Sequence, residues 1–410
     1  MIRGRAPSLP QVLLAVLNVT LVACGNDHQP LGPQPTPRPT QTSFATPRPT
    51  QTGAPTLPAM KLGETGRATS VNGREWIVVR SSPAGAVLGF QTAVVLPPDA
   101  GPDAGPLPEL ACFDSSTLPD GSCFHEFDLP LDVAETDWLS GLAVFVSGGA
   151  PSAVAVAFQS GGAARSLDSS AASLPCLVPT AETIGVGPGP LFFALATCRL
   201  DGIAATLPVV WRSADAASLA LLPMTGFSAG PRPARADADG RIAGAGIVPE
   251  LPVVWRLAGD AYTLERLPLL DGGTRGGALG IDAGQIVGWS DDASGDEHAV
   301  AWQEGAEGFA VEQLPRPDFA TSCARATASS AQRIAGLCAD DGGSFGVVWT
   351  AGETDGWRVE LLLGPVGAGD SAALGISGDL AVGWSGSDAR PVPAAWRLPH
   401  SDAAPGGSPP

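Results

Sequence analysis

The sequence predicts an all-β fold: a β-propeller of seven four-stranded blades, with six and eight blades as alternatives. One observation is a set of tryptophans separated by 44, 47, 47 and 47 residues: Trp211, Trp255, Trp302, Trp349 and Trp396. Each ends a similar apolar run, such as LPVVW or FGVVW. The 52 glycines and 40 prolines suit tight turns, and no window shows sustained helical periodicity. Four short strands in a repeat of about 45 residues are typical of a propeller blade.

The chain begins with a segment typical of a signal peptide, residues 1–23. Arg3 and Arg5 precede the apolar stretch Val12–Ala23, which at 12 residues is too short to span a bilayer. Leu21-Val22-Ala23-Cys24 resembles the lipobox of bacterial lipoproteins, which implies cleavage before Cys24 and lipid attachment to it. The alternative is an ordinary signal peptide that contains a cysteine. We expect a lipid anchor in the bacterial cell envelope, at the outer membrane.

Residues 24–54 form the predicted lipidated N-terminus and linker. The heptapeptide TPRPTQT occurs twice, at Thr36–Thr42 and Thr46–Thr52. Proline at this density favours extended polyproline II over helix or sheet, so we expect a disordered Pro/Thr-rich tether. The repeat domain is expected over residues 55–400, followed by a disordered tail over 401–410.

The composition excludes some partners. The formal net charge is −18, and removing residues 1–23 with their two arginines gives −20. Such an acidic body is repelled by nucleic acid and by anionic lipid headgroups, so we expect neither as a partner. With 44% hydrophobic and 16% charged residues, the body is expected to be globular.

The repeat continues, in degraded form, toward the N-terminus. AVAFQSG at Ala155–Gly161 matches AVAWQEG at Ala299–Gly305, with Phe158 in place of the tryptophan. An earlier copy is AGAVLGF at Ala84–Phe90, and Leu96 ends the strand that follows it. Seven units result. We call the residue at the tryptophan position of each unit its keyed residue, and we expect the keyed side chains to fill the space between blades. The keyed residues are Leu96, Phe158, Trp211, Trp255, Trp302, Trp349 and Trp396.

The unit ALGIDAGQIVGWS…DEHAVAW resembles the extracellular repeat called HAF, named after a His-Ala-Phe signature. One unit carries the histidine, as His298-Ala299-Val300, with valine replacing phenylalanine. The resemblance covers roughly residues 230–398. It implies an exported β-rich protein, and it implies no particular activity.

Six cysteines remain besides Cys24, and an oxidising compartment favours disulfides. Two pairs each flank the first two strands of a unit, where an antiparallel hairpin brings such positions together. A third pair closes the loop ACFDSSTLPDGSCF. The expected bridges are Cys112–Cys123, Cys176–Cys198 and Cys323–Cys338.

The sequence offers no catalytic residue, metal site or cofactor site. GFSAG at Gly226–Gly230 matches the nucleophile-elbow pattern, but Pro231 and Pro233 forbid the helix that this geometry needs, so we interpret it as a linker. The histidines are His28, His125, His298 and His400, too few and too scattered to favour a catalytic triad.

Two acidic loops resemble parts of calcium loops, and we interpret both as solvated turn acids. In Asp237-Ala238-Asp239-Gly240, Arg235 occupies the place of the first carboxylate. Ser290-Asp291-Asp292 with Asp296-Glu297 is denser. Tyr262 is the only tyrosine, which disfavours an aromatic carbohydrate platform, and we interpret Trp289 and Trp384 as packed strand residues.

Two classes of function remain. The favoured one is a lipid-anchored, non-catalytic propeller that binds an extracellular protein or glycan, or acts as a scaffold. The alternative is a propeller enzyme, a glycosidase or lyase, with carboxylates gathered near the axis. The expected first strands (ALGI, ATAS, ALGIS, TIGVG) contain almost no charged residues, which disfavours the enzyme.

The seventh unit lacks a fourth strand, because the chain after Pro399 reads HSDAAPGGSPP. An uncompleted blade would leave a bare edge. The segment Thr56–Leu62 has the required apolar residues, so we predict that it completes this blade and brings the two chain ends side by side.

Overall fold

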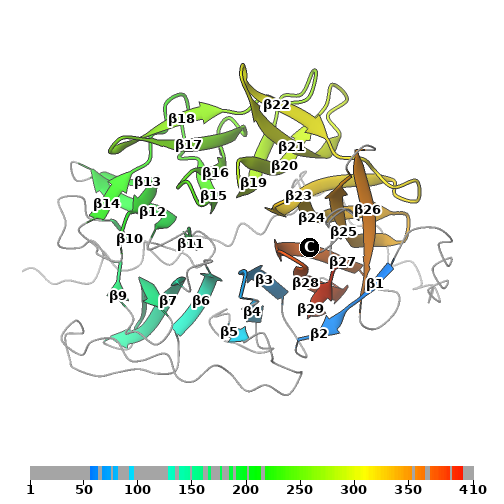
Figure 1. The fold of residues 1–410 in the computed structure, drawn as a ribbon. Coiled ribbons are helices and arrows are strands. Elements are labelled where there is room, and N and C mark those ends of the chain that lie inside the picture. The colour runs from blue at the N-terminus through cyan, green and yellow to red at the C-terminus, as the bar shows by residue number, and fades with distance from the viewer. Residues whose placement is uncertain are drawn as a thin grey trace, which may run out of the picture. The chain divides into compact units, whose positions relative to one another are not determined.

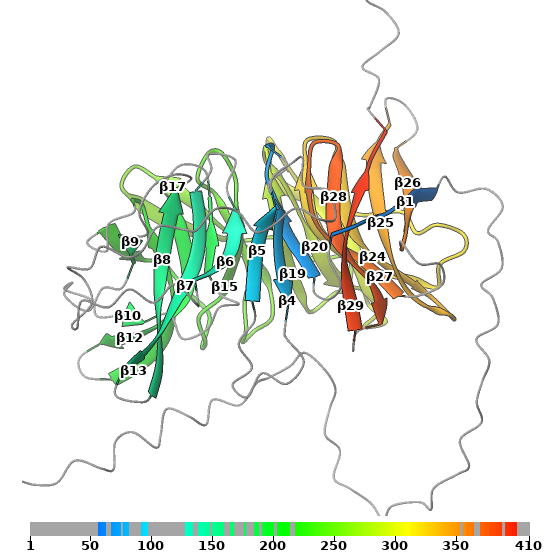
Figure 2. The same ribbon diagram turned by 90° about the horizontal axis from the view of Figure 1, so that it is seen from below.

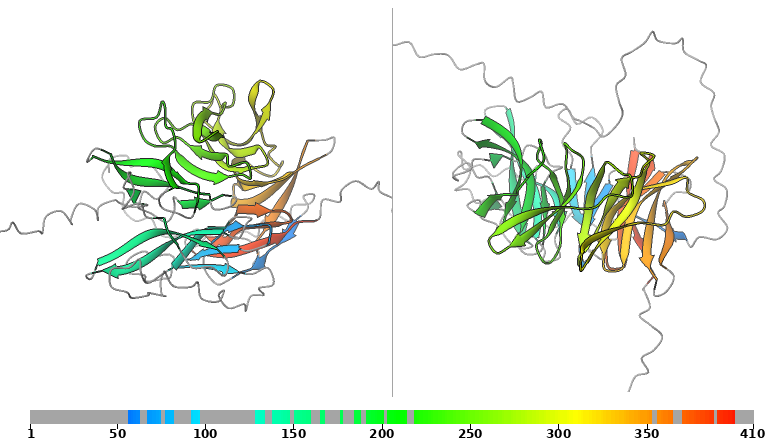
Figure 3. Two further views of the ribbon diagram at one scale, coloured as in Figure 1. Left: turned by 60° about the vertical axis from the view of Figure 1, so that its left-hand side comes forward. Right: turned by 90° about the horizontal axis from the view of Figure 1, so that it is seen from above.

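A computed structural model gives the fold. It describes residues 56–62, 67–74, 77–81, 92–96, 128–133, 138–147, 150–159, 165–167, 176–177, 184–187, 191–200, 203–213, 218–352, 356–364, 370–387 and 390–399. Every named element of these residues is a β-strand, as the two views of Figure 3 show, which confirms the all-β class. None of these residues belongs to a helix of the length and hydropathy needed to cross a membrane.

The described strands form seven sheets, in the chain order of the seven predicted units (Figure 1). The first sheet contains β3 (Arg67–Val71), β4 (Ile77–Ser81) and β5 (Thr92–Leu96). The second contains β6 (Asp128–Val133), β7 (Trp138–Ser147), β8 (Ala150–Gln159) and β9 (Arg165–Ser166). The third contains β10 (Cys176–Leu177), β11 (Ile184–Val186), β12 (Phe192–Leu200), β13 (Ile203–Trp211) and β14 (Leu219–Leu221).

The other four sheets follow the same plan. The fourth contains β15 (Arg232–Ala236), β16 (Ile242–Ala245), β17 (Pro252–Ala258) and β18 (Ala261–Arg266), and the fifth β19 (Gly276–Asp282), β20 (Gln285–Asp291), β21 (Glu297–Gly305) and β22 (Gly308–Gln313). The sixth contains β23 (Ser322–Ser330), β24 (Arg333–Asp340), β25 (Gly343–Ala351) and β26 (Trp357–Leu363), and the seventh β27 (Asp370–Ser377), β28 (Leu380–Ser387) and β29 (Arg390–Arg397).

The keyed residues occupy one register position in all seven sheets. Each lies on the third strand, opposite a residue near one end of the second strand. The pairs are Leu96–Ile77, Phe158–Leu139, Trp211–Phe192, Trp255–Ile242, Trp302–Ile286, Trp349–Ile334 and Trp396–Ala381. The five tryptophans are at most 1% exposed. Their predicted position in the core is therefore confirmed.

The first strands share a β-bulge. In six sheets the pairing of first and second strands shifts register within the first strand, as between Ala278 and Gly280, and β23 has two such shifts. A bulge bends a strand and turns its side chains. The residue after the bulge meets the next first strand: a Cβ on Gly280 would lie 2.8 Å from the Ala328 Cα. This contact explains the small residues of the ALGI-type motifs.

Neighbouring sheets pack face to face. The first strands contact one another in the order β3, β6, β11, β15, β19, β23, β27 and again β3. The seventh sheet packs on the first through a buried apolar cluster that includes Ala68, Val79, Leu380 and Val382. The first and the seventh sheets are therefore in contact through buried apolar side chains.

Four tryptophans also hydrogen-bond to the preceding sheet. Each donates its indole N–H to a backbone carbonyl that ends or follows that sheet's fourth strand. The bonds are Trp255 to Pro223 (2.8 Å), Trp302 to Pro268 (2.7 Å), Trp349 to Pro315 (2.8 Å) and Trp396 to Leu363 (2.7 Å). We call these four bonds the indole latches.

The segment Thr56–Leu62 joins the last two sheets, as Figure 2 shows for β1 beside β26. Its second half completes the seventh sheet as predicted: β2 (Met60–Lys61) pairs antiparallel with β29, and the Leu62 N–H bonds to Pro393. Its first half differs from the prediction. The strand β1 (Thr56–Pro58) pairs parallel with β26 of the sixth sheet. The segment turns between two sheet edges because Leu57 and Ala59 pack on the apolar cluster that these sheets share.

One predicted disulfide is confirmed. Cys323 and Cys338 are bonded, with their Cα atoms 3.9 Å apart. For the second, Cys198 is disulfide-bonded and lies opposite Cys176 in the register of β10 and β12. The Cys176 side chain is outside the description, so this pairing stays a prediction. Cys112 and Cys123 lie outside the described residues, as do Cys24 and the tether.

Candidate functional site

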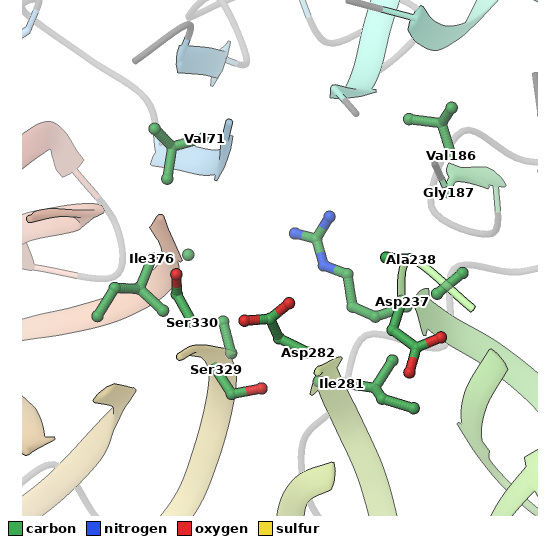
Figure 4. A pocket seen from close by; sticks show the side chains of 15 residues that line it. Val71, Val186, Gly187, Asp237, Ala238, Ile281, Asp282, Ser329, Ser330 and Ile376 are labelled. Carbon is green, nitrogen blue, oxygen red and sulfur yellow. The ribbon is translucent and has the colours of Figure 1, made fainter. Parts of the chain in front are cut away.

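Two cavities in the described part of the chain bring polar side chains together. The first lies between the first strands of six sheets and has a volume of about 170 Å³ (Figure 4). We call it the first-strand cavity. Its walls come from β3, β11, β15, β19, β23 and β27 and from the turns after them. It is lined by Val71, Val186, Gly187, Arg235, Ala236, Asp237, Ala238, Gly280, Ile281, Asp282, Ala328, Ser329, Ser330, Gly375 and Ile376.

Arg235 crosses this cavity from the fourth sheet to the first. Its guanidinium donates to the Ser70 hydroxyl at 3.3 Å and to the Thr69 carbonyl at 3.2 Å. The β-bulge after Pro233 changes the direction in which the Arg235 side chain points. The expectation of first strands nearly free of charge came from the motifs ALGI, ATAS, ALGIS and TIGVG, which belong to other sheets, and it did not include the segment RPARA that forms β15. The expectation that the first strands contain almost no charge is wrong on this point.

The two carboxylates of the cavity are held by hydrogen bonds. Asp282 points toward the middle of the cavity in Figure 4 and accepts the Ala331 N–H at 2.7 Å. Asp237 is 3% exposed and accepts bonds from the Asp239 and Arg241 N–H groups and from the Arg241 guanidinium at 2.7 Å. Burial raises the pKa of Asp237, although the charge and hydrogen bonds of Arg241 act in the opposite direction. The interpretation of Asp237 as a solvated turn acid is therefore wrong, because its oxygens close a buried turn.

The second cavity lies between the fifth and sixth sheets, near the start of β21 and β23, and has a volume of about 560 Å³. We call it the His298 cavity. Most of its lining is polar. It is lined by Asp296, Glu297, His298, Gln313, Leu314, Arg316, Thr321, Ser322, Cys323 and Ala324.

Both ring nitrogens of His298 are hydrogen-bonded. The Gln313 side-chain nitrogen lies 3.1 Å from Nδ1, and Oδ2 of Asp292 lies 2.9 Å from Nε2. An amide nitrogen only donates, so Nδ1 accepts and the neutral ring carries its proton on Nε2, which donates to Asp292. This bond, with the Ser294 and Asp296 N–H groups, lowers the pKa of Asp292. The single histidine of the HAF-like signature is thus fixed in position and tautomer.

The walls around His298 are held on both sides. Glu297 lies 3.6 Å from the Arg325 guanidinium, which also lies over the Trp289 ring at 5.8 Å from its centroid. The bridge from Cys323 to Cys338 ties the start of β23 to the end of β24. These contacts hold the residues around His298 in place.

Asp291, next to this site, is a buried structural acid. It is 2% exposed and accepts bonds from the Thr274 N–H (2.6 Å), the Arg275 N–H (2.7 Å) and the Thr274 hydroxyl (3.0 Å). Burial alone would raise its pKa, but these bonds together lower it. The interpretation as a solvated acid is wrong here too. Within the described residues, no group of three or more His, Cys, Asp or Glu side chains could hold a metal ion.

The other predicted residues lie as follows. The GFSAG segment connects β14 to β15, and its Ser228 hydroxyl bonds to the Val248 carbonyl at 3.2 Å, which confirms the linker interpretation. Trp289 and Trp384 are 4% and 6% exposed and are packed strand residues, as predicted. His28, His125 and His400 lie outside the described residues.

Comparisons with known proteins add no family. No protein-family model matches the chain, and no curated protein matches it. Similar solved structures include a puromycin-hydrolyzing peptidase from Mycobacterium tuberculosis, with 14% identity and a TM-score of 0.44 over 85% of this chain and 54% of that one. A second, from a study of two prolyl endopeptidases, has 12% identity and a TM-score of 0.48 over 81% and 47%. TolB from Acinetobacter baumannii has 12% identity and a TM-score of 0.37 over 72% and 63%. The chain spans about half the length of the two peptidase structures.

Proposed function

We propose that the chain is a lipid-anchored β-propeller of seven blades that binds a partner without catalysis at the bacterial cell envelope. The cycle of contacts among first strands, the packing of the seventh sheet on the first and the β1–β2 segment support a closed ring. The lipobox at Cys24 and the Pro/Thr-rich tether support the anchor. The outer membrane is its proposed location.

The binding site in this proposal is the His298 cavity. The observation that carries it is His298 itself, whose two nitrogens are both bonded, so the ring shapes a wall and is not poised as a free base. A site whose side chains are already held loses little conformational freedom on binding. This preorganisation favours recognition over proton transfer.

A protein that presents basic side chains is the partner we propose. Asp296 and Glu297 line the cavity together with one arginine, Arg316, and Glu297 also pairs with Arg325. The whole chain carries a formal charge of −18, and this excess of negative charge attracts cationic groups. A glycan usually needs an exposed aromatic face, and Trp289 next to the cavity is 4% exposed. Charge and exposure therefore both favour a basic protein over a glycan.

Cross-linking and pull-down from intact cells tests this function. Wild type should capture a protein, and Asp296→Asn with Glu297→Gln should reduce that capture several-fold because the carboxylates are lost. Glu307→Gln removes an exposed charge in the turn between β21 and β22 of the same sheet and should leave capture unchanged. Capture of a glycan alone, equal capture by all variants, or no captured molecule would contradict the proposal.

A further inference from the structure

Asp237, Asp282 and Ser330 occupy equivalent positions in three neighbouring sheets, and all three line the first-strand cavity. Each directly follows the first-strand residue that pairs with the partner of a keyed tryptophan, as Ile281 pairs with Ile286 in the fifth sheet. The repeat therefore places one polar side chain from each of these sheets at the same register position of the cavity wall.

Asp282 and Ser330 make the same structural bond. Oδ2 of Asp282 accepts the Ala331 N–H at 2.7 Å, and the hydroxyl of Ser330 accepts the Gly378 N–H at 3.0 Å. In both cases the donor belongs to the turn after the first strand of the next sheet. A hydroxyl is enough for this bond between neighbouring sheets, so the bond does not need the negative charge of Asp282.

No arginine, lysine or histidine forms an ion pair with Asp282 in the part of the chain that the structure describes. Of the arginines in the adjoining turns, Arg241 pairs with three other carboxylates and Arg333 pairs with Asp379. Arg235 is tied to the first sheet. A half-buried charge is costly without a partner, so a cation at this place would lower the free energy of the folded protein.

We propose that the first-strand cavity binds a small primary ammonium compound with a short aliphatic body, whose ammonium group pairs with Asp282. The carboxylate of Asp282 points toward the middle of the cavity in Figure 4, with Ser330 beside it. A carboxylate only accepts hydrogen bonds, and a cationic donor both fills this role and balances the charge. The aliphatic side chains of Val71, Ile281 and Ile376 line the same cavity and suit an alkyl chain.

The lining and the size of the cavity disfavour other cations. A metal ion needs several oxygen, nitrogen or sulfur ligands, and the described residues contain no cluster of three that could hold one. Quaternary ammonium ions are recognised by aromatic rings, and the residues that line this cavity include no aromatic side chain. Its volume of about 170 Å³ is below the roughly 300–1,000 Å³ of sites for drug-sized ligands. The first-strand cavity shares no lining residue with the His298 cavity, so this inference does not depend on the function proposed above.

Isothermal titration calorimetry of the mature protein with n-butylammonium chloride tests the proposal. Wild type should bind one ion per chain. Asp282→Ser should weaken this binding about tenfold or more, because a charge-assisted hydrogen bond is lost. Its melting temperature should stay near that of wild type, because serine makes the equivalent bond at Ser330. Asp282→Asn, which keeps the length and an acceptor oxygen, should lose binding in the same way.

Two control variants show whether the effect belongs to this cavity. Asp271→Asn removes an exposed charge and should bind n-butylammonium like wild type. Asp296→Asn with Glu297→Gln changes the His298 cavity and should also leave the binding unchanged. A loss of binding in this double variant, with normal binding in Asp282→Ser, would place the ion in the other cavity and overturn the proposal.

Two further titrations separate charge from shape. n-Butanol, the neutral analogue, should not bind, and potassium chloride should not compete better than choline chloride at equal ionic strength. Binding of n-butanol as strong as that of n-butylammonium would show an apolar cavity without charge recognition. Specific competition by potassium would show a site for an inorganic ion. Either result would overturn the proposal, as would equal binding by wild type and Asp282→Ser or no binding of n-butylammonium to wild type.

Discussion

A keyed tryptophan performs two tasks at once. Its ring fills the space between two sheets, and its N–H pairs with a carbonyl near the end of the preceding sheet. Phenylalanine keeps an aromatic ring but is smaller and cannot donate, so this substitution removes the hydrogen bond together with part of the packing.

Replacing Trp349 by phenylalanine should reduce the free energy of unfolding by about 1–3 kcal/mol. The reason is that the Pro315 carbonyl loses its donor at a buried junction. Urea denaturation of the mature protein would measure it. Trp357→Phe, whose indole bond is exposed, should change stability by no more than about 0.5 kcal/mol. Equal losses in the two variants would contradict a stabilising role for the buried bond.

The carboxylate of Asp291 makes stability depend on pH. Hydrogen bonds from Thr274 and Arg275 lower the pKa of Asp291 in the folded protein. Its carboxylate therefore stabilises the fold above the unfolded pKa of about 3.9, and this stabilisation is lost as the pH falls through the folded pKa. Asp291→Asn should therefore lose less stability than wild type between about pH 5 and about pH 3. Denaturant midpoints at both pH values would check this. Asp271→Asn, at an exposed position, is the control, and an unchanged pH dependence in Asp291→Asn would exclude Asp291 as the cause.

Among the elements, the segment formed by β1 and β2 is the one whose position depends on the whole fold. It leaves its own neighbour in the chain, the first sheet, and pairs with β26 and β29 at the other end of the sequence. Both of those strands would otherwise be bare outer edges, which are costly and prone to pair with other chains. Two short strands therefore protect two edges.

Deleting residues 55–63 should lower the unfolding temperature of the repeat domain, because it removes both pairings and the packing of Leu57 and Ala59. Deleting residues 31–53, within the predicted tether, should leave it unchanged. Differential scanning calorimetry of the two deletions would compare them directly. If neither deletion shifts the transition, the segment does not stabilise the fold.

For the molecule as a whole, the proposed anchor at Cys24 and the repeat domain can be tested separately. Cys24→Ser should release the protein from membranes or leave an unprocessed precursor, because lipidation needs the thiol. Cell fractionation and gel mobility would show either outcome. A variant that fractionates and migrates like wild type would contradict the lipoprotein proposal. The repeat domain of the released protein should melt as in wild type, since its strands make their contacts among themselves.

The sequence by itself determined the class of the fold, the repeat period, the keyed positions, the Cys323–Cys338 bridge and the segment that completes the seventh sheet. These features follow from short-range patterns: alternating apolar residues, turn residues between them and the pairing of adjacent strands. They recur every 44 or 47 residues, so each copy supports the interpretation of the others.

Only the tertiary structure decided which polar groups meet. The bonds of Arg235 to a strand 165 and 166 residues away, the fixing of His298 between Asp292 and Gln313, and the burial of Asp237 and Asp291 were not predicted. Hydrogen bonds depend on positions to within a few tenths of an ångström, and those positions are set by how bulged strands of different sheets approach one another. A repeat pattern specifies the strands but not these distances, so the latches, the tie of Arg235 and the His298 cavity become visible only when the sheets are packed.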